Sequence, residues 1–337
     1  MLRIGMIGCG GIANVHITGF LQLTDRARIT AVCDADSARA VDAAARVGGA
    51  RIHEGFQELV QDDEVDAVDI CLPHHLHAPA IIAAAQAGKH VLCEKPLCIS
   101  PAEAAAVREA VRASGITLMC AHNQLFEPAM GRARELLEAN ALGTVQFARA
   151  SDCFRADRTA EQWGWRREAR TMGGGELIDT GYHPTYTLLY LLGLAGQRPV
   201  EVTALLGRHR QTVLEGEDTA HVLVRFSGGA IGQILTSWAF ELPHGSYSFH
   251  LVGEHGQLYG RKNALHFQPN GGEVESTIGP EANSYHTQLP HFVESIERGS
   301  RPIQNEEDGI SVLNLILAAY ESDQAKRTVP FGDGTGQ

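Results

Sequence analysis

The sequence predicts two halves of different fold class. Up to about residue 122, short apolar runs alternate with helical patterns, which is typical of an α/β fold with a doubly wound parallel sheet. From residue 123 onward, runs with period-two alternation follow one another without helices between them. They indicate an α+β half with an open-faced, mostly antiparallel sheet. A length of 337 residues suits two domains, residues 1–122 and 123–337.

The first strand, residues 2–7, ends in a glycine-rich turn. The sequence Gly8-Cys9-Gly10-Gly11-Ile12-Ala13 fits the pattern G-x-G-x-x-G/A. Gly8 permits the tight turn, Gly10 lets the backbone approach a pyrophosphate, and Ala13 allows close helix–strand packing. The following helix offers its N–H groups to phosphates. The pattern alone also fits an ordinary turn.

The second strand, residues 29–33, ends in Asp34, which follows Ala13 by 21 residues. An acid at this distance is placed to accept hydrogen bonds from the adenosine ribose hydroxyls. It also repels a 2′-phosphate, so NAD is favoured over NADP. Asp34 would serve equally as a helix cap, and both roles stay open here.

The alternation then continues through the first half. Pro73-His74-His75-Leu76-His77 follows a strand, where ligands bind in such sheets, and we expect this loop beside the ribose or nicotinamide. No Cys or carboxylate stands at a metal-ligand spacing from these histidines, so no metal is expected. His77 also suits the start of a helix without a chemical role. The predicted elements are a helix at 37–47, a strand at 65–72, a helix at 78–88, a strand at 91–93, a helix at 101–114 and a strand at 117–120.

The strand at residues 91–93 is followed by Glu94, Lys95 and Pro96. A lysine at the carboxyl end of a parallel strand is well placed for chemistry and badly placed for packing. A free lysine has a pKa of ~10.4. A cationic Lys95 would therefore hydrogen-bond a substrate oxygen and stabilise charge that develops on it. A lysine whose pKa burial lowers would instead act as the base.

In the second half, one predicted helix opens at Gly173-Gly174-Gly175 and ends near Leu192. Asp179 and His183 are four residues apart and would share a face of it. The carboxylate would fix the ring tautomer, and the other ring nitrogen would take a proton from a hydroxyl. A surface pair without function is the alternative. The other predicted elements are helices at 129–140, 287–298 and 306–325, strands at 145–151, 200–206, 219–226, 230–239, 246–252 and 264–267, and turns at 228–229 and 253–258.

Aromatic and basic residues lie together just upstream, in Trp163-Gly164-Trp165-Arg166-Arg167. Trp163 or Trp165 would pack on a sugar ring, and Arg166 or Arg167 would bind a substrate carboxylate or hydroxyls. An ion pair at the rim is an equal alternative for the arginines.

Composition excludes several classes of partner. With 28 Lys and Arg against 40 Asp and Glu, the formal charge is -12, which argues against nucleic acid or an anionic membrane. No apolar run approaches the ~20 residues of a transmembrane helix, and the first strand leaves no room for a signal peptide. Seven cysteines without a Cys-x-x-Cys pair indicate reduced core thiols in a cytoplasmic protein.

Taken together, the glycine motif, Asp34, Gly88-Lys89-His90-Val91-Leu92-Cys93-Glu94-Lys95-Pro96, and Gly173–Gly175 with Asp179 and His183 resemble the glucose–fructose oxidoreductase, inositol dehydrogenase and rhizopine-catabolism (Gfo/Idh/MocA) family. The resemblance implies a Rossmann domain, a C-terminal sheet used for homodimer or homotetramer formation, and NAD(P)-dependent chemistry on sugars, cyclitols and related polyols. It also implies that Lys95 contacts substrate and cofactor, that the bond before Pro96 is often cis, and that Asp179 and His183 serve proton transfer.

Three positions depart from the family pattern. Pro73-His74-His75-Leu76-His77 replaces Pro-Asn-x-x-His, Leu125 stands where an Arg is common, and Tyr186 stands where an Asp is frequent. These positions are expected near the substrate pocket, so the identity of the substrate does not carry over.

We therefore expect an NAD-dependent dehydrogenase that oxidises a secondary alcohol of a sugar, anhydrosugar or cyclitol. The alternatives are an isomerase, epimerase or glycoside-cleaving enzyme that recycles a tightly bound NAD, and a non-catalytic NAD-binding regulator. The expected catalytic residues are Lys95, Asp179 and His183, and substrate contacts add Trp163 and Arg166. The expected cofactor contacts are Gly8, Gly10, Gly11, Ile12, Asp34, Pro73, His74, His77, Glu94, Lys95 and Asn123.

Overall fold

The computed structural model describes residues 1–332, which divide into two compact units. Unit 1 comprises Met1–Asn123 together with Asn283–Ile310, and unit 2 comprises Gln124–Ala282 and the chain from Ser311 onward. The segment Asn283–Ile310 thus returns to the first unit, although the division at residue 122 had placed it in the second half.

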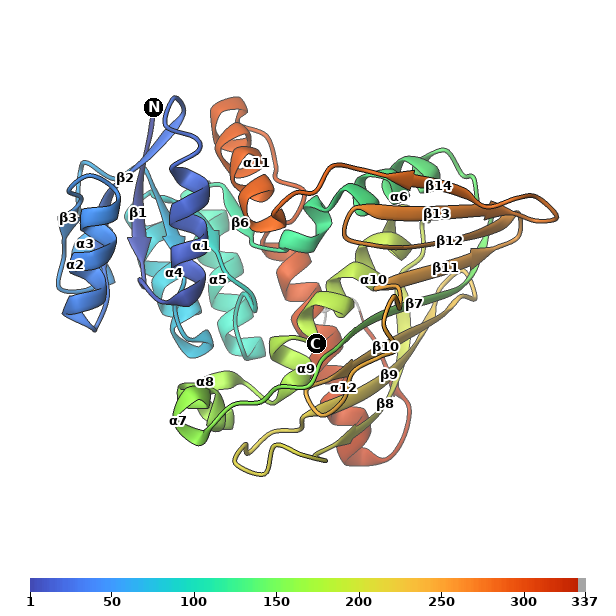
Figure 1. Cartoon of the computed structure of the whole chain (residues 1–337). Coiled ribbons are helices and arrows are strands. Elements are labelled where there is room, and N and C mark those ends of the chain that lie inside the picture. The colour runs from blue at the N-terminus through green and yellow to red at the C-terminus, as the bar shows by residue number, and fades with distance from the viewer. Residues whose placement is uncertain (333–337) are drawn as a thin grey trace. The chain divides into compact units, whose positions relative to one another are not determined.

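Unit 1 is built on a six-stranded parallel sheet in the order β3-β2-β1-β4-β5-β6 (Figure 1). The strand order reverses at β1, and in such sheets the crevice beyond the carboxyl ends at this point binds ligands. The elements are β1 Leu2–Ile7, α1 Gly11–Phe20, β2 Ala27–Cys33, α2 Ser37–Arg46, β3 Arg51–Ile52, α3 Phe56–Leu59, β4 Ala67–Ile70, the 3₁₀ turn His74–Leu76, α4 His77–Gln86, β5 His90–Cys93, α5 Pro101–Ser114, β6 Leu118–Cys120 and α11 Ser284–Arg298.

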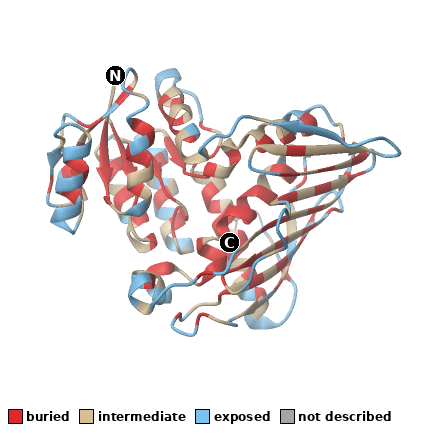
Figure 2. Cartoon of the chain, viewed as in Figure 1, coloured by how far each residue is buried: buried red, intermediate tan, exposed pale blue. Residues whose placement is uncertain are grey.

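The strands of this sheet form its core. Every residue of β4 and β6 is buried, and so is β5 after its first residue (Figure 2). Continuous burial is expected of a parallel sheet covered on both faces. The helix α5 has the predicted bounds, because Ser100 caps its first turn and Gly115, with a φ of 68°, ends it.

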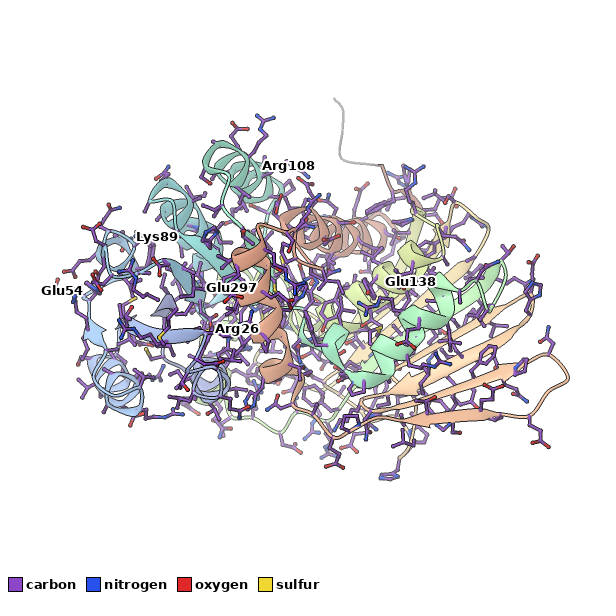
Figure 3. All side chains as sticks on the ribbon, turned by 90° about the horizontal axis from the view of Figure 1, so that it is seen from above. Arg26, Glu54, Lys89, Arg108, Glu138 and Glu297 are labelled. Carbon is purple, nitrogen blue, oxygen red and sulfur yellow. The ribbon has the colours of Figure 1, made fainter. Side chains whose placement is uncertain are left out.

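The returning segment is held to unit 1 by packing and by ion pairs. Helix α11 packs against α1, where a Cβ on Gly19 would lie 2.6 Å from the Leu289 side chain. Arg26 lies beside Glu297 of α11, with Nη2 2.5 Å from Oε2 (Figure 3). Arg108 of α5 holds both carboxylate oxygens of Glu307, at 2.6 and 2.7 Å.

Unit 2 is built on a nine-stranded sheet in the order β14-β13-β12-β11-β7-β10-β9-β8-β15. Every neighbouring pair is antiparallel except β7 and β10, so the predicted fold class is confirmed in both halves. The elements are α6 Pro128–Glu138, β7 Val145–Cys153, α7 Ala160–Trp163, the 3₁₀ turn Gly164–Arg167, α8 Ala169–Met172, α9 Glu176–Asp179, α10 Tyr182–Leu194, β8 Pro199–Gly207, β9 Thr219–Phe226, β10 Ile231–Ser237, β11 Phe249–Gly253, β12 Gly256–Arg261, β13 Ala264–Pro269, β14 Glu275–Ile278 and β15 Val329–Pro330. The 3₁₀ turn Asn123–Phe126 and helix α12 Glu306–Ala325 cross the boundary between the units.

Burial alternates along the strands of unit 2 (Figure 2). Helix α10 packs on β7, β10 and β11, and α6 packs on β12, β13 and β14. Three of the outward positions carry large apolar side chains: Leu205, Leu223 and Ile231 are 68%, 43% and 48% exposed. Among the described residues, no helix combines the length and hydropathy needed to cross a membrane.

Two of the predicted elements of unit 2 have a different form in the structure, and the short elements α7, α8, β14 and β15 were not predicted. The segment 253–258 is not only a turn, because β11 ends at Gly253 and β12 begins at Gly256 and pairs with it. The single helix predicted from the glycine run to Leu192 is two helices, α9 and α10. The N–H of Gly181 donates to the carbonyl of Glu176 at 2.9 Å, five residues back, so the turn between the helices is wider than an α-helical turn.

Candidate active site

The glycine-rich turn of unit 1 leaves open space at the start of α1. Gly8 has a φ of 87°, and a Cβ there would lie 2.5 Å from the carbonyl oxygen of Cys71. Gly10 is the N-cap of α1, without a side-chain cap among the described residues. Within the described chain, a Cβ on Gly10 or Gly11 would meet no atom within 4 Å. The N–H groups of the first turn therefore face an uncrowded space of the kind that a phosphate fills.

Asp34 lies beside this turn, at the carboxyl end of β2. Its Oδ2 accepts a hydrogen bond from the Cys9 N–H at 2.7 Å, and its Oδ1 accepts one from the Asp36 N–H at 2.8 Å. The residue that caps α2 is Asp36, whose side chain accepts from the Ala38 N–H. The capping role that the sequence left open for Asp34 therefore belongs to Asp36.

The histidine loop that follows β4 is largely buried. His77 has no exposed surface, and its ring nitrogens lie 2.6 Å from the Pro96 carbonyl oxygen and 2.8 Å from the Leu72 carbonyl oxygen. Burial outweighs the effect of these two carbonyls and lowers the pKa of His77, and the neutral ring can donate its one N–H to only one of them. His74 is also buried, with its ring centroid 5.9 Å from that of His77. His77 is the first residue of α4, and it joins the loop after β4 to the turn that carries Lys95.

The turn Glu94-Lys95-Pro96 follows β5, and the Lys95–Pro96 peptide bond is cis, as the resemblance implies. Glu94 is 6% exposed, and its Oε2 accepts from the Lys95 N–H at 3.2 Å. Two buried oxygens lie at this edge, Glu94 Oε1 and Asn123 Oδ1. Neither accepts a hydrogen bond of ordinary geometry from the described residues, although His16 Nε2 lies 3.3 Å from Glu94 Oε1. The amide nitrogen of Asn123 donates to Ser284 Oγ at 2.8 Å, which leaves its oxygen as an acceptor.

In unit 2, Asp179 ends α9 and His183 lies in the first turn of α10; both are buried. His183 Nδ1 lies 2.8 Å from the Tyr186 hydroxyl, which also accepts from the Gln124 N–H at 3.2 Å. The Asp179 carboxylate accepts from Arg166 Nε at 2.6 Å. Nδ1 therefore has the Tyr186 hydroxyl as a partner, and the role of Asp179 in orienting the ring stays a prediction. The spacing of three residues within one helix was the available signal.

The predicted substrate contacts upstream of α9 have different environments. Trp163 is 1% exposed, with its ring centroid 4.7 Å from that of Trp238, so it is a core residue. The Arg166 guanidinium lies 4.3 Å from the centroid of the Trp165 ring and pairs with Asp179. The ion pair considered for the arginines is therefore the observed arrangement for Arg166.

Two of the three glycines before α9 are explained by packing within unit 2, and Gly173, with a φ of 91°, ends α8. A Cβ on Gly174 would lie 2.2 Å from the Tyr320 hydroxyl, and one on Gly175 would lie 2.2 Å from the Glu217 carbonyl oxygen. The close approach that the sequence suggested is therefore made to Glu217 and Tyr320.

Comparison with known proteins identifies the family. The model described as the oxidoreductase family with an NAD-binding Rossmann fold matches residues 2–122, and the GFO/IDH/MocA C-terminal domain matches residues 130–259. The 1,5-anhydro-D-fructose reductase of Ensifer adhaerens is 30% identical over 96% of each chain. The D-xylose 1-dehydrogenase (NADP(+)) 2 of Haloferax volcanii is 29% identical over 97% of this chain and 99% of its own. The crystal structure of an aldose–aldose oxidoreductase from Caulobacter crescentus superposes with a TM-score of 0.86 at 26% identity, covering 98% of this chain and 99% of that one.

The chain belongs to the Gfo/Idh/MocA family. The predicted enzyme class, an NAD(P)-dependent oxidoreductase acting on CH–OH groups, is confirmed. Lys95 lies in unit 1, whereas Asp179 and His183 lie in unit 2, so each unit carries part of the predicted catalytic set.

The residues of unit 1 fit the cofactor that the family's Rossmann domain binds. The space at the start of α1 suits a pyrophosphate, and the Asp34 carboxylate suits ribose hydroxyls. The acceptor oxygens of Glu94 and Asn123, which follow β5 and β6, suit the two N–H groups of a nicotinamide carboxamide. These residues would hold NAD with its nicotinamide at the carboxyl edge of β5 and β6.

Unit 2 contains a polar cavity of about 400 Å³ that the sequence did not indicate. Gln124 lines it, and the Gln124 N–H bonds the same Tyr186 hydroxyl that contacts His183. Burial raises the pKa of Glu127 to about 7, so this carboxyl can either donate or accept a hydrogen bond near neutrality. The acidic and basic residues of its wall come from loops and strand ends far apart in the sequence: Glu127, Asp152, Glu241, His244, Arg261 and Lys262.

Proposed function

We propose that this protein is an NAD-dependent dehydrogenase that oxidises a secondary alcohol of a sugar, anhydrosugar or cyclitol. The observation that carries the proposal is the Glu94-Lys95-Pro96 turn at the carboxyl end of β5, in a unit whose glycine turn and Asp34 fit NAD. Unit 2 adds His183, held at Nδ1 by a hydroxyl. The relatives in Ensifer adhaerens and Haloferax volcanii are named for reactions of an anhydrosugar and of a sugar, which supports this class of substrate.

In the proposed reaction, the C–H and O–H bonds of a secondary alcohol break and a ketone forms. Bound NAD supplies the acceptor for the hydride, which carries both electrons. His183 Nε2 accepts the hydroxyl proton, and the Tyr186 hydroxyl holds the ring through Nδ1. Lys95 hydrogen-bonds the same oxygen and stabilises the negative charge that develops on it. Arg166 fixes the Asp179 carboxylate, four residues before His183, and a carboxylate near the ring would favour the imidazolium.

We propose NAD as the preferred cofactor over NADP. The Asp34 carboxylate is held by the backbone of the glycine turn, where it faces the site of the adenosine ribose. A 2′-phosphate at that place would meet a negative charge. The Haloferax volcanii relative is named for NADP, so this preference belongs to the chain's own residues and not to the family.

A second function, in which NAD is recycled without leaving the protein, also deserves a test. The structure from Caulobacter crescentus is named as an aldose–aldose oxidoreductase, a reaction between two sugars. If this chain works in that way, reduced nicotinamide will not accumulate with a single substrate. It will appear and disappear within one turnover when a second sugar is supplied.

We also propose that the chain forms a homodimer or homotetramer through the open face of the unit 2 sheet. Exposed Leu205, Leu223 and Ile231 lie on that face, and large apolar side chains in such positions indicate an interface. Sedimentation equilibrium on the full chain measures the assembly directly, and a monomer at micromolar concentration would contradict it.

The experiment that tests the main proposal follows the absorbance of reduced nicotinamide. The protein is mixed with NAD and, one at a time, with monosaccharides, anhydrosugars and inositols. A rise with one class of compound supports the dehydrogenase and names its substrate class. If the absorbance does not rise with any compound although calorimetry shows that NAD binds, the result favours the recycling enzyme. An unchanged absorbance together with no binding of NAD contradicts the proposal as a whole.

A further inference from the structure

A buried polar cluster lies beneath the Glu94-Lys95-Pro96 turn of unit 1. His16 of α1 has no exposed surface, and its Nδ1 lies 2.8 Å from Oδ2 of Asp69, which is also fully buried on β4. Its Nε2 lies 3.3 Å from Oε1 of Glu94. One imidazole thus bridges two carboxylates, and one of those carboxylates belongs to the turn that carries Lys95.

Two carboxylates share one imidazole in this cluster, so only an imidazolium at His16 places a positive charge between them. An isolated buried carboxylate is costly, and it is stable when a cation accompanies it. Burial opposes a charge on His16, but Asp69 and Cys71 together outweigh that effect and raise the pKa of His16 well above its usual value. Burial would likewise raise the pKa of Glu94, but the hydrogen bond and charge of His16, followed by Lys95 and His77, lower it.

Two other arrangements of the same atoms compete with this one. The side-chain amide of Gln288 on α11 lies 3.3 Å from His16 Nε2, and a donating amide there would require a neutral ring. His16, Asp69 and Cys71 also offer three ligand atoms within 4.8 Å of one another, as a metal site would. Two ligands of a tetrahedral zinc ion lie about 3.3 Å apart. The 2.8 Å between His16 and Asp69 is instead the length of a direct hydrogen bond.

We propose that His16 is a positioning residue that acts through Glu94. As an imidazolium held by Asp69, it keeps the Glu94 carboxylate ionised and directs Oε1 toward the carboxamide of bound nicotinamide. This inference rests on the proposed function, because it takes Glu94 as a cofactor contact. It adds that the affinity of the site for NAD depends on a residue that does not itself touch the cofactor.

The inference predicts a specific pH dependence. In the wild type, Glu94 stays ionised from pH 6 to 9, and its ionisation causes no change in NAD affinity over this range. In His16→Gln the cation is lost, so Glu94 takes up a proton within this range and NAD binds about tenfold more weakly at its acid end, since a charge-assisted hydrogen bond is replaced by a neutral one. The titratable and charged groups that face the cluster, and that are common to all variants, are Asp69 and Cys71 at β4, Lys95 after β5, His77 of α4, His122 after β6 and Tyr285 of α11.

The first measurement is made on the protein alone. Nitrogen-15 NMR of histidine-labelled wild type, with His16 assigned from the His16→Gln spectrum, reports whether both ring nitrogens carry protons. Both should be protonated at pH 8, and Asp69→Asn should lower the pKa of the ring. A neutral His16 at pH 7 in the wild type would overturn the proposal in favour of the Gln288 arrangement. Stoichiometric zinc that is lost in His16→Gln would overturn it in favour of a metal site.

The second measurement is NAD affinity by calorimetry between pH 6 and 9. His16→Gln should acquire an inflection that the double variant with Glu94→Gln lacks. A uniform loss of affinity without an inflection would mean that His16 is merely structural, and it would overturn the proposal. The matched control is His53→Gln, which breaks another buried histidine–aspartate pair of unit 1, at 2.9 Å to Asp62, and should add no inflection. Failure of the wild type to bind NAD would contradict the proposed function, whereas the NMR result would still decide the charge of His16.

Discussion

Two pairs of buried carboxyl groups, one pair in each unit, have different partners, and the pKa values of their glutamates are shifted in opposite directions. In unit 1, Asp69 and Glu94 share the imidazole of His16, and the pKa of Glu94 is lowered. In unit 2, Glu176 and Glu217 lie close enough to repel each other. Burial and that repulsion raise the pKa of Glu176 well above its usual value, and burial raises the pKa of Glu217 to about 7.

The difference is caused by the partners and not by the depth of burial. Glu176 is fully buried, accepts a hydrogen bond from Thr236, and has a second oxygen without a partner among the described residues. Glu217 accepts from the Leu177 N–H and the Tyr320 hydroxyl, which are uncharged. A carboxyl without a cation is stable in the interior when it is protonated. The pair of unit 1 thus holds charge where a charged cofactor would bind, whereas the environment of Glu176 and Glu217 in unit 2 favours their protonated forms.

The largest effect we expect comes from removing the charge of Lys95. Lys95→Ala should lower kcat by about 10²–10³-fold, the loss typical of one group that stabilises a developing oxyanion. The dissociation constant for NAD should change by less than about threefold. Steady-state rates measure kcat, and calorimetry measures the dissociation constant for NAD.

His183→Ala, in unit 2, should lower kcat by about 10²-fold or more and leave the affinity for NAD unchanged. Near-normal turnover in either variant would contradict its catalytic role.

A smaller loss is expected at Tyr186, which holds His183 by a hydroxyl. Tyr186→Phe keeps the ring and removes the oxygen that lies 2.8 Å from Nδ1, so the tautomer of His183 is no longer fixed. We expect kcat to fall by about 10–10²-fold, with a shifted pH profile and unchanged NAD affinity. An altered KM with an unchanged pH profile would show that Tyr186 serves the shape of the pocket and not the ring of His183.

In unit 1, Asp34→Asn tests whether charge selects the cofactor. The amide oxygen can still accept one of the two backbone hydrogen bonds, from Cys9 or Asp36, so the glycine turn should persist. Without the negative charge, the ratio of kcat/KM for NAD to that for NADP should fall by about tenfold. An unchanged ratio would mean that another group repels the 2′-phosphate.

Local patterns predicted the parts of the site that lie in single turns. The glycine motif, Asp34 and the Glu94-Lys95-Pro96 turn each follow one strand, and the parallel sheet brings the ends of those strands to one edge. The presence of Asp69 inside an otherwise apolar strand was a signal that a buried partner exists. Its partner His16 is 53 residues away, and the sequence around Asp69 does not indicate which side chain it pairs with.

Features that depend on contacts between distant segments of the chain could not be predicted from local patterns. The amphipathic pattern of α11 predicts a buried face but not the sheet that buries it, so the return of Asn283–Ile310 to unit 1 gave no sequence signal. The cavity of unit 2 is lined by loops and strand ends whose proximity depends on the order of nine strands. The glycines before α9 indicated a close approach, and only the fold shows that Glu217 and Tyr320 are what they approach.

The mildest test asks whether the neutral acids of unit 2 limit its stability. The pKa of Glu217 is about 7 in the folded chain and about 4.5 in the unfolded chain, so the folded state binds more protons between these values. The contribution of Glu217 to the free energy of unfolding is therefore fully present below pH 4.5 and is lost as the pH rises through about 7. The slope of this loss is up to about 1.4 kcal/mol per pH unit for one proton.

Glu217→Gln should remove that share of the slope, because a neutral amide keeps the shape of the protonated acid. All three tryptophans lie in unit 2, so their fluorescence during urea unfolding between pH 5 and 8 reports on this unit. Glu138→Gln, at an exposed position of α6 (Figure 3), is the matched control and should leave the slope unchanged. An equal slope in wild type and Glu217→Gln would show that Glu217 is ionised in the folded chain, and the contrast between the two units would then rest on Glu176 alone.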